Sequence, residues 1–210
     1  KNALYTSGRL LDENLSDDTN GYKLIRSDGT TEGTTVLKDA FLSSWGSDPR
    51  YMISFNNQYV FMATGGYLVD TQYMYVTDGT PAGTRYVADL GYNYDWEVVN
   101  EWFYYTAMGF SSGRWVWQLW KTKGTPETSS VVFEQQGYDD MSYPQGMTKV
   151  GNKLYYYDFN GGLWISEAVG EGHVTGRLRE FDEVYSITAV GEEAFILVNE
   201  GGILELWKTT

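Results

Sequence analysis

The strongest constraint on the fold is a short aromatic segment that occurs five times in the chain. The copies are YKLIRSDGT (22–30), QYMYVTDGT (72–80), WQLWKTKGT (117–125), GGLWISEAV (161–169) and ILELWKTT (203–210). When Leu24, Met74, Leu119, Leu163 and Leu206 are aligned, successive copies are 50, 45, 44 and 43 residues apart. Such a nearly constant period is typical of structural repeats.

Each repeat predicts four short β-strands. A hairpin with a tight polar turn, as in MTKVGNKLYYYDF (147–159), precedes the aromatic segment, and a further β-rich run follows it. The second strand of each repeat is apolar on both faces, so we expect it to lie between neighbouring sheets.

Antiparallel four-stranded units of this length are typical of β-propeller blades, whereas the coils of a β-solenoid are usually shorter. The sequence therefore predicts an all-β fold: one propeller domain over residues 1–210 with about five four-stranded blades. The approximate repeats are 1–50, 51–96, 97–143, 144–183 and 184–210. The first lacks its first strand and the last its fourth, so the terminal blades have three strands or the two chain ends pair with each other.

The Asp-Gly-Thr segment after the aromatic strand favours a structural turn. The turn residues are Asp28, Gly29, Thr30, Asp78, Gly79 and Thr80. Asp forms an Asx turn and Gly adopts positive φ. A phosphate loop would need a Lys and a following helix, and a calcium loop would need alternating carboxylates. Lys123 replaces the Asp in the third copy. A structural turn tolerates this replacement, whereas a catalytic carboxylate could not be replaced by Lys.

The repeated segment resembles E-L-W-K-T-D-G-T-x-x-G-T, a repeat of large bacterial secreted and surface proteins. ELWKT (205–209), QLWKT (118–122) and the turns SDGTTEGT and TDGTPAGT carry this resemblance. The layout is also similar to WD-repeat blades and to the Asp-box turn of sialidase-like propellers. The resemblance implies a bacterial extracellular or cell-surface propeller, and no single activity, because propellers host many.

Charge and composition limit the kinds of partner that this protein is expected to bind. The net charge of −13 disfavours nucleic acid, and no apolar run is long enough for membrane insertion. His173 is expected to be a solvated turn residue, and doublets such as Asp182-Glu183 to be solvated acidic surface. We therefore expect no enzyme, no catalytic residue, no cofactor and no metal site. Asp12, Glu13, Asp17 and Asp18 give calcium only weak support, because their spacing does not match an EF-hand.

The loops that join successive repeats combine aromatic and acidic side chains. The candidate ligand-binding residues are Trp45, Asp48, Tyr94, Asp95, Trp96, Tyr138, Asp139 and Tyr143. Aromatic rings beside carboxylates suit protein interfaces and sugar rings, and rings that fold inward would instead plug a central channel. The sequence favours a non-catalytic module that binds protein or a surface polymer, ahead of a lectin of the five-bladed propeller type and a glycan-active enzyme.

Overall fold

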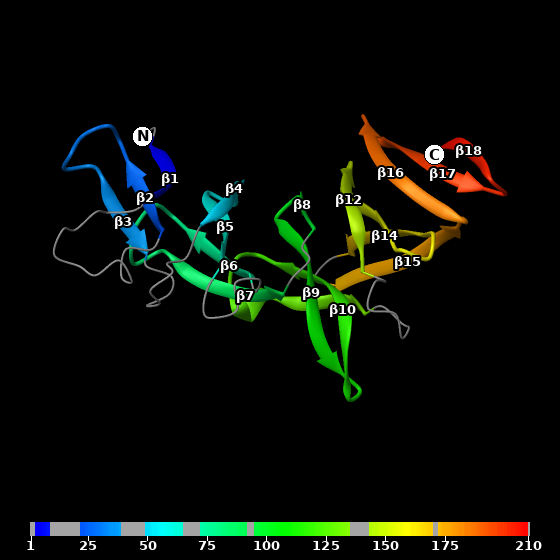
Figure 1. The fold of residues 1–210 in the computed structure, drawn as a ribbon, viewed down its shortest axis with the longest axis horizontal. Coiled ribbons are helices and arrows are strands. Elements are labelled where there is room, and N and C mark those ends of the chain that lie inside the picture. The colour runs from blue at the N-terminus through cyan, green and yellow to red at the C-terminus, as the bar shows by residue number, and fades with distance from the viewer. Residues whose placement is uncertain are drawn as a thin grey trace. The chain divides into compact units, whose positions relative to one another are not determined.

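The protein is an all-β chain whose strands form five antiparallel sheets of three or four strands (Figure 1). The computed structural model describes residues 3–8, 22–38, 49–64, 72–91, 95–134, 143–169 and 172–209. These residues fall into two compact units, residues 1–92 with 124–129 and residues 93–123 with 130–210. No helix in the described ranges has the length and apolarity needed to cross a membrane.

The described residues of the first unit form two sheets and a short 3₁₀ helix. Its first sheet has the strand order β1 (Leu4–Gly8), β2 (Lys23–Ser27), β3 (Thr35–Lys38). Its second sheet has the order β4 (Arg50–Phe55), β5 (Gln58–Thr64), β6 (Gln72–Thr77), β7 (Arg85–Gly91). The helix η2 (Pro126–Thr128) contacts β7.

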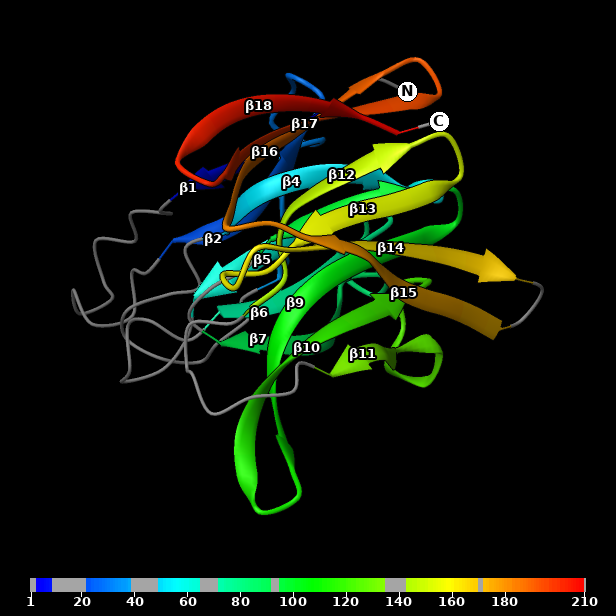
Figure 2. The same cartoon turned by 90° about the vertical axis from the view of Figure 1, so that its right-hand side faces the viewer.

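The second unit contains three sheets (Figure 2). The first comprises β8 (Trp96–Val99), β9 (Trp102–Ser111), β10 (Arg114–Thr122) and β11 (Ser130–Glu134). The second comprises β12 (Gln145–Val150), β13 (Lys153–Tyr157), β14 (Gly162–Val169) and β15 (Gly172–Glu180). The third comprises β16 (Glu183–Val190), β17 (Glu193–Glu200) and β18 (Ile203–Lys208).

These sheets confirm the all-β prediction. The five aromatic segments are β2, β6, β10, β14 and β18, and each pairs with the strand before it as a hairpin partner. The first and last sheets have three strands. The radial arrangement of the sheets and the single domain stay predictions.

Inner strands are buried on both faces because successive sheets within a unit pack against each other. In β13, Leu154 and Tyr156 pack with residues of β8–β10, whereas Tyr155 packs with residues of β16 and β17. Tyr156 and Leu154 are fully buried. A strand that is apolar on both faces can be buried only by sheets on both of its sides.

The two Asp-Gly-Thr turns have the same hydrogen bonds. Asp78 Oδ1 accepts from Thr80 N at 2.9 Å and from Thr80 Oγ1 at 2.7 Å, and Thr80 Oγ1 accepts from Gly83 N at 3.0 Å. The corresponding distances at Asp28 are 3.1, 2.7 and 2.9 Å. Gly29 and Gly79 have φ of 92° and 89°, which strains any other residue. The hydrogen bonds from Thr80 lower the pKa of Asp78.

The third turn keeps this backbone without the Asp. Gly124 has φ of 100°, and Thr125 Oγ1 accepts from Thr128 N at 3.3 Å, as Thr80 Oγ1 accepts from Gly83 N. Ser129 Oγ donates to Thr125 O at 2.9 Å. The Asp is therefore not needed to reverse the chain.

A second residue changes together with that Asp. A Cβ added to Gly83 would lie 2.0 Å from Asp78 Oδ1, so the carboxylate excludes any side chain there. In the third turn Lys123 replaces the Asp and Thr128 replaces this Gly. The Asp and the Gly five positions after it thus form one packing unit.

We expect Gly83→Ala to lower the free energy of unfolding by about 2 kcal/mol, because the Asp78 carboxylate must leave its hydrogen bonds with Thr80. In an Asp78→Ala background the same change should cost under about 0.5 kcal/mol. Urea unfolding of the four proteins of this cycle measures the coupling. Additive effects of the two substitutions would contradict the assignment.

Candidate functional site

An acidic cleft of about 490 Å³ lies between the sheets β12–β15 and β16–β18 of the second unit. Its lining residues come from the start of β12, the end of β13 and the corner after it, and the start of β16 with the residue before it: Gln145, Tyr157, Asp158, Phe159, Asp182, Glu183, Val184 and Tyr185. These eight residues include three aromatic rings and three carboxylates and no basic side chain. Phe159 and Tyr185 are exposed and line the cleft with ring surface.

The carboxylates of this cleft build its walls. Asp158 is buried, and its Oδ1 accepts from Asn160 N at 2.9 Å and Gly162 N at 3.0 Å, while its Oδ2 accepts from Trp164 Nε1 at 2.8 Å. Asp182 Oδ2 accepts from Gly201 N at 2.7 Å. These hydrogen bonds hold the two carboxylates in place.

Asp95 joins two neighbouring sheets of the second unit. Its Oδ2 accepts from Met147 N of β12 at 2.8 Å, and its Oδ1 accepts from Trp96 N at 2.9 Å. Burial raises the pKa of Asp95, and the hydrogen bonds from Met147 and Trp96 oppose that shift. Glu97 Oε2 accepts from Lys149 N of the same strand at 3.4 Å. The two carboxylates satisfy N–H groups on the edge of β12.

Two further candidate residues turn towards the interior. Trp96 is half-buried at the start of β8, and the Tyr143 ring lies 5.3 Å from the ring of Trp117, which is buried in β10. Trp45, Asp48, Tyr94, Tyr138 and Asp139 lie outside the described residues. The structure therefore gives Asp95 hydrogen bonds within the protein and Tyr143 a ring contact, and ligand binding by all eight residues stays a prediction.

His173 is not a solvated turn residue, so that expectation is wrong. It lies in β15 and is half-buried, with Nε2 2.5 Å from Tyr104 Oη and Nδ1 3.2 Å from Lys121 Nζ. Because an ammonium group only donates, Nδ1 accepts from Lys121, which leaves Nε2 protonated to donate to Tyr104. Lys121 Nζ also lies 4.1 Å from the centroid of the Trp102 ring. These side chains form a polar tie between β15 and the hairpin β9–β10.

The hairpin β9–β10 carries an exposed aromatic pair. Phe110 and Trp115 are cross-strand partners whose rings lie 5.5 Å apart at 71°, and they are 65% and 63% exposed. In the part of the chain that the structure describes, β8 pairs only with Trp102–Tyr105 of β9, and β11 pairs only with Gln118–Lys121 of β10. The distal half of the hairpin therefore extends beyond its neighbouring strands (Figure 2).

Sequence reasoning singled out Asp182 and Glu183 only as solvated acidic surface, and it did not identify the rest of the acidic cleft or this hairpin end. Phe110 and Trp115 fit an ordinary strand pattern, and only the short length of β8 and β11 leaves them exposed. For the calcium hypothesis, Asp12, Glu13, Asp17 and Asp18 lie outside the described residues. Within the described ranges, no group of three or more acidic or His side chains could hold a metal ion.

Comparisons with known proteins place no family on the chain. No family model matches it, and no curated protein matches it. Among solved structures it is similar to the tricorn protease, with 9% identity and a TM-score of 0.40 over 84% of this chain and 22% of that chain. The chain thus spans about a fifth of the length of that protein.

A second solved structure is a mutant of an α-L-arabinofuranosidase from Fusarium graminearum in complex with an iminosugar inhibitor. Identity is 8% and the TM-score 0.37, over 99% of this chain and 71% of that chain. Both TM-scores are too low for either likeness to inform function.

We expect His173 to make stability depend on pH. Burial, together with the positive charge of Lys121, lowers the pKa of His173 to about 4 from its ordinary 6.5. The unfolded chain therefore takes up a proton between pH 6.5 and 4 that the folded chain does not, so this contribution is present above pH 6.5 and is lost as the pH falls.

The full shift corresponds to about 3 kcal/mol, and because the ring is only half-buried we expect roughly half of that. Urea unfolding at pH 7 and pH 4.5 measures it, and His173→Gln should lose about 1–2 kcal/mol less than the unmodified protein between these values. Parallel losses in both proteins would show that His173 does not contribute.

Proposed function

We propose that the chain is a non-catalytic binding module of a bacterial extracellular or cell-surface protein, with its five sheets arranged radially as propeller blades. Two features support the arrangement: strands apolar on both faces, and face-to-face packing of successive sheets within each unit. We further propose that its partner is a protein.

The exposed pair Phe110–Trp115 is the observation that carries this proposal. Large exposed rings that contact each other at the end of an extended hairpin form an apolar patch, and Trp is frequent among the residues that dominate binding energy at protein interfaces. No Asp or Glu occurs between residues 102 and 122, although the chain contains 28 acidic residues. The hairpin end therefore adds no negative charge of its own that would repel an acidic partner.

A carbohydrate-binding lectin is the second candidate, and the acidic cleft favours it. Aromatic rings of Tyr157, Phe159 and Tyr185 next to the carboxylates of Asp182 and Glu183 could stack on a sugar and accept its hydroxyl hydrogen bonds. A glycan-active enzyme has less support, because glycoside hydrolysis needs two carboxylates free to act on one bond. In this cleft Asp158 and Asp182 accept hydrogen bonds from the protein itself.

Two double variants separate these functions. We expect Phe110→Ala/Trp115→Ala to weaken binding to bacterial cell envelopes by about 30-fold or more, since losing such an anchor costs about 2 kcal/mol. Phe159→Ala/Tyr185→Ala in the acidic cleft is the matched control and should bind as the unmodified protein does. Protease treatment of the envelopes should abolish binding.

Other outcomes contradict the protein-binding proposal. Binding that survives protease treatment, appears on a glycan array and is lost only in the cleft variant would establish the lectin. Release of sugars from envelope polysaccharide would establish an enzyme. Both variants remove exposed rings, so we expect both to fold as the unmodified protein does. Circular dichroism checks the folding of each variant before binding is compared.

A further inference from the structure

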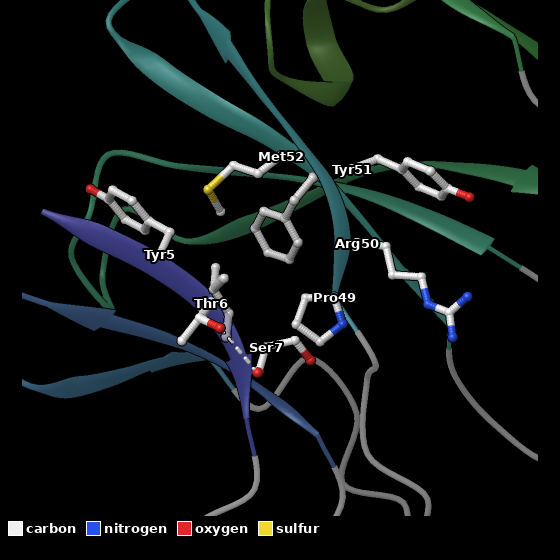
Figure 3. A pocket seen from close by; sticks show the side chains of 9 residues that line it. Tyr5, Thr6, Ser7, Pro49, Arg50, Tyr51 and Met52 are labelled. Carbon is white, nitrogen blue, oxygen red and sulfur yellow. Dashed lines mark hydrogen bonds between the residues drawn. The ribbon is translucent and has the colours of Figure 1, made fainter.

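A second pocket, of about 100 Å³, lies in the first unit between the sheets β1–β3 and β4–β7. Its lining residues are Tyr5, Thr6, Ser7, Leu24, Pro49, Arg50, Tyr51, Met52 and Phe61. Figure 3 shows Tyr5 and Met52 on one side of the pocket and Pro49 near Ser7, whereas the side chains of Arg50 and Tyr51 extend away from it. The walls are thus mainly apolar.

One buried polar atom faces this pocket without a partner. Ser7 Oγ has almost no solvent-accessible surface and no hydrogen-bond partner among the described residues. Buried hydroxyl groups in folded proteins are nearly always paired, because an unpaired one costs about 1–3 kcal/mol. The hydroxyl therefore points to a polar atom that a ligand supplies.

The repeat shows what shape that ligand has. Ser7 pairs with Leu24 and Tyr157 pairs with Leu163, so Ser7 and Tyr157 are equivalent positions in their sheets. The Tyr157 ring packs against the core between its own sheet and the next, and its hydroxyl donates to Tyr185 O at the start of that next sheet at 3.2 Å. At the equivalent junction of the first unit, Ser7 has no ring to fill this space.

A strained residue borders the same pocket. The bulge of β4 lies between Arg50 and Ile53 and holds Tyr51 at φ 55°, whereas the equivalent bulge of β12 has Gly146 at φ 65°. Positive φ is costly for a bulky residue, at about 1–3 kcal/mol, and such strain is frequent at ligand-binding sites. The bulge turns Arg50 and Tyr51 outward, and Met52 then lines the pocket.

We propose that this pocket binds a phenolic ring, either a free small molecule or the Tyr side chain of a partner. The ring takes the position that the Tyr157 ring has at the equivalent junction, packs against Tyr5, Met52 and Phe61, and hydrogen bonds through its hydroxyl to Ser7 Oγ. A sugar fits less well, because its other hydroxyls would be buried against apolar walls. The volume of the pocket exceeds what one water needs and is below the 150 Å³ or so of a closed cavity that binds benzene. A pocket of this size suits a ring that enters from one open side and is not fully enclosed.

The experiment titrates the protein with p-cresol and with toluene and follows the methyl resonance of Met52. We expect p-cresol to bind about tenfold more tightly than toluene, because toluene leaves Ser7 Oγ unpaired. Ser7→Ala should make the two affinities equal. Ser7→Tyr should fill the pocket, abolish binding of both probes and raise the melting temperature.

Tyr157→Ser is the matched control, since it opens the same space in the second unit and should add a second p-cresol site. Phe110→Ala/Trp115→Ala should leave p-cresol binding unchanged, so this proposal and the proposed function fail separately. N-acetyl-tyrosinamide distinguishes the two sources of the phenolic ring. If it binds, the ring is the Tyr side chain of a partner. If it does not bind while p-cresol does, the ring belongs to a free phenol. No shift of Met52 at about 10 mM p-cresol, or equal binding in Ser7→Tyr, would overturn the proposal.

Discussion

The structure depends on one constraint: its inner strands are apolar on both faces, and no sheet can cover both faces of its own strands. In β13 the consecutive residues Leu154, Tyr155 and Tyr156 are all buried, and they face two neighbouring sheets in alternation. Within a unit each sheet is therefore stabilised by its neighbours rather than by a core of its own. Leu206 illustrates the converse, because it is 68% exposed in the last sheet although its counterparts Leu24, Leu119 and Leu163 are buried.

Packing of the apolar faces does not satisfy the backbone N–H groups on the sheet edges, so polar side chains accept their hydrogen bonds. The edge of β12 is paired through Asp95 and Glu97, and the corner after β13 is held by Asp158. Many of the carboxylates of this acidic chain thus accept backbone N–H groups. Where β8 meets β12, acidic and aromatic residues occur together because the Tyr143 ring packs on Trp117 and the carboxylates of Asp95 and Glu97 pair the backbone of β12.

The strand pattern could be predicted because it occurs in five copies, and each copy constrains the interpretation of the others. The polar contacts could not be predicted from the sequence. The sequence around His173 indicates a loop, whereas in the structure β14 and β15 extend through the degenerate turn and bring His173 to Tyr104. The exposure of Phe110 and Trp115 was equally hidden, because it depends on where β8 and β11 end. Among the loop candidates, Asp95 was found as a notable residue, but its partner Met147 is 52 positions away.

The repeats also separate neutral variation from variation that has a function. In the third turn Lys123 replaces Asp and Thr128 replaces Gly, and the backbone and its hydrogen bonds persist, so the two changes compensate each other. Ser7 and Tyr51 differ from Tyr157 and Gly146 in another way, since Ser7 leaves a buried hydroxyl unpaired and Tyr51 retains positive φ. Selection for stability alone would remove either feature by a single substitution. Two such costs that border one pocket are what a binding site requires when it is stabilised by its ligand rather than by the protein.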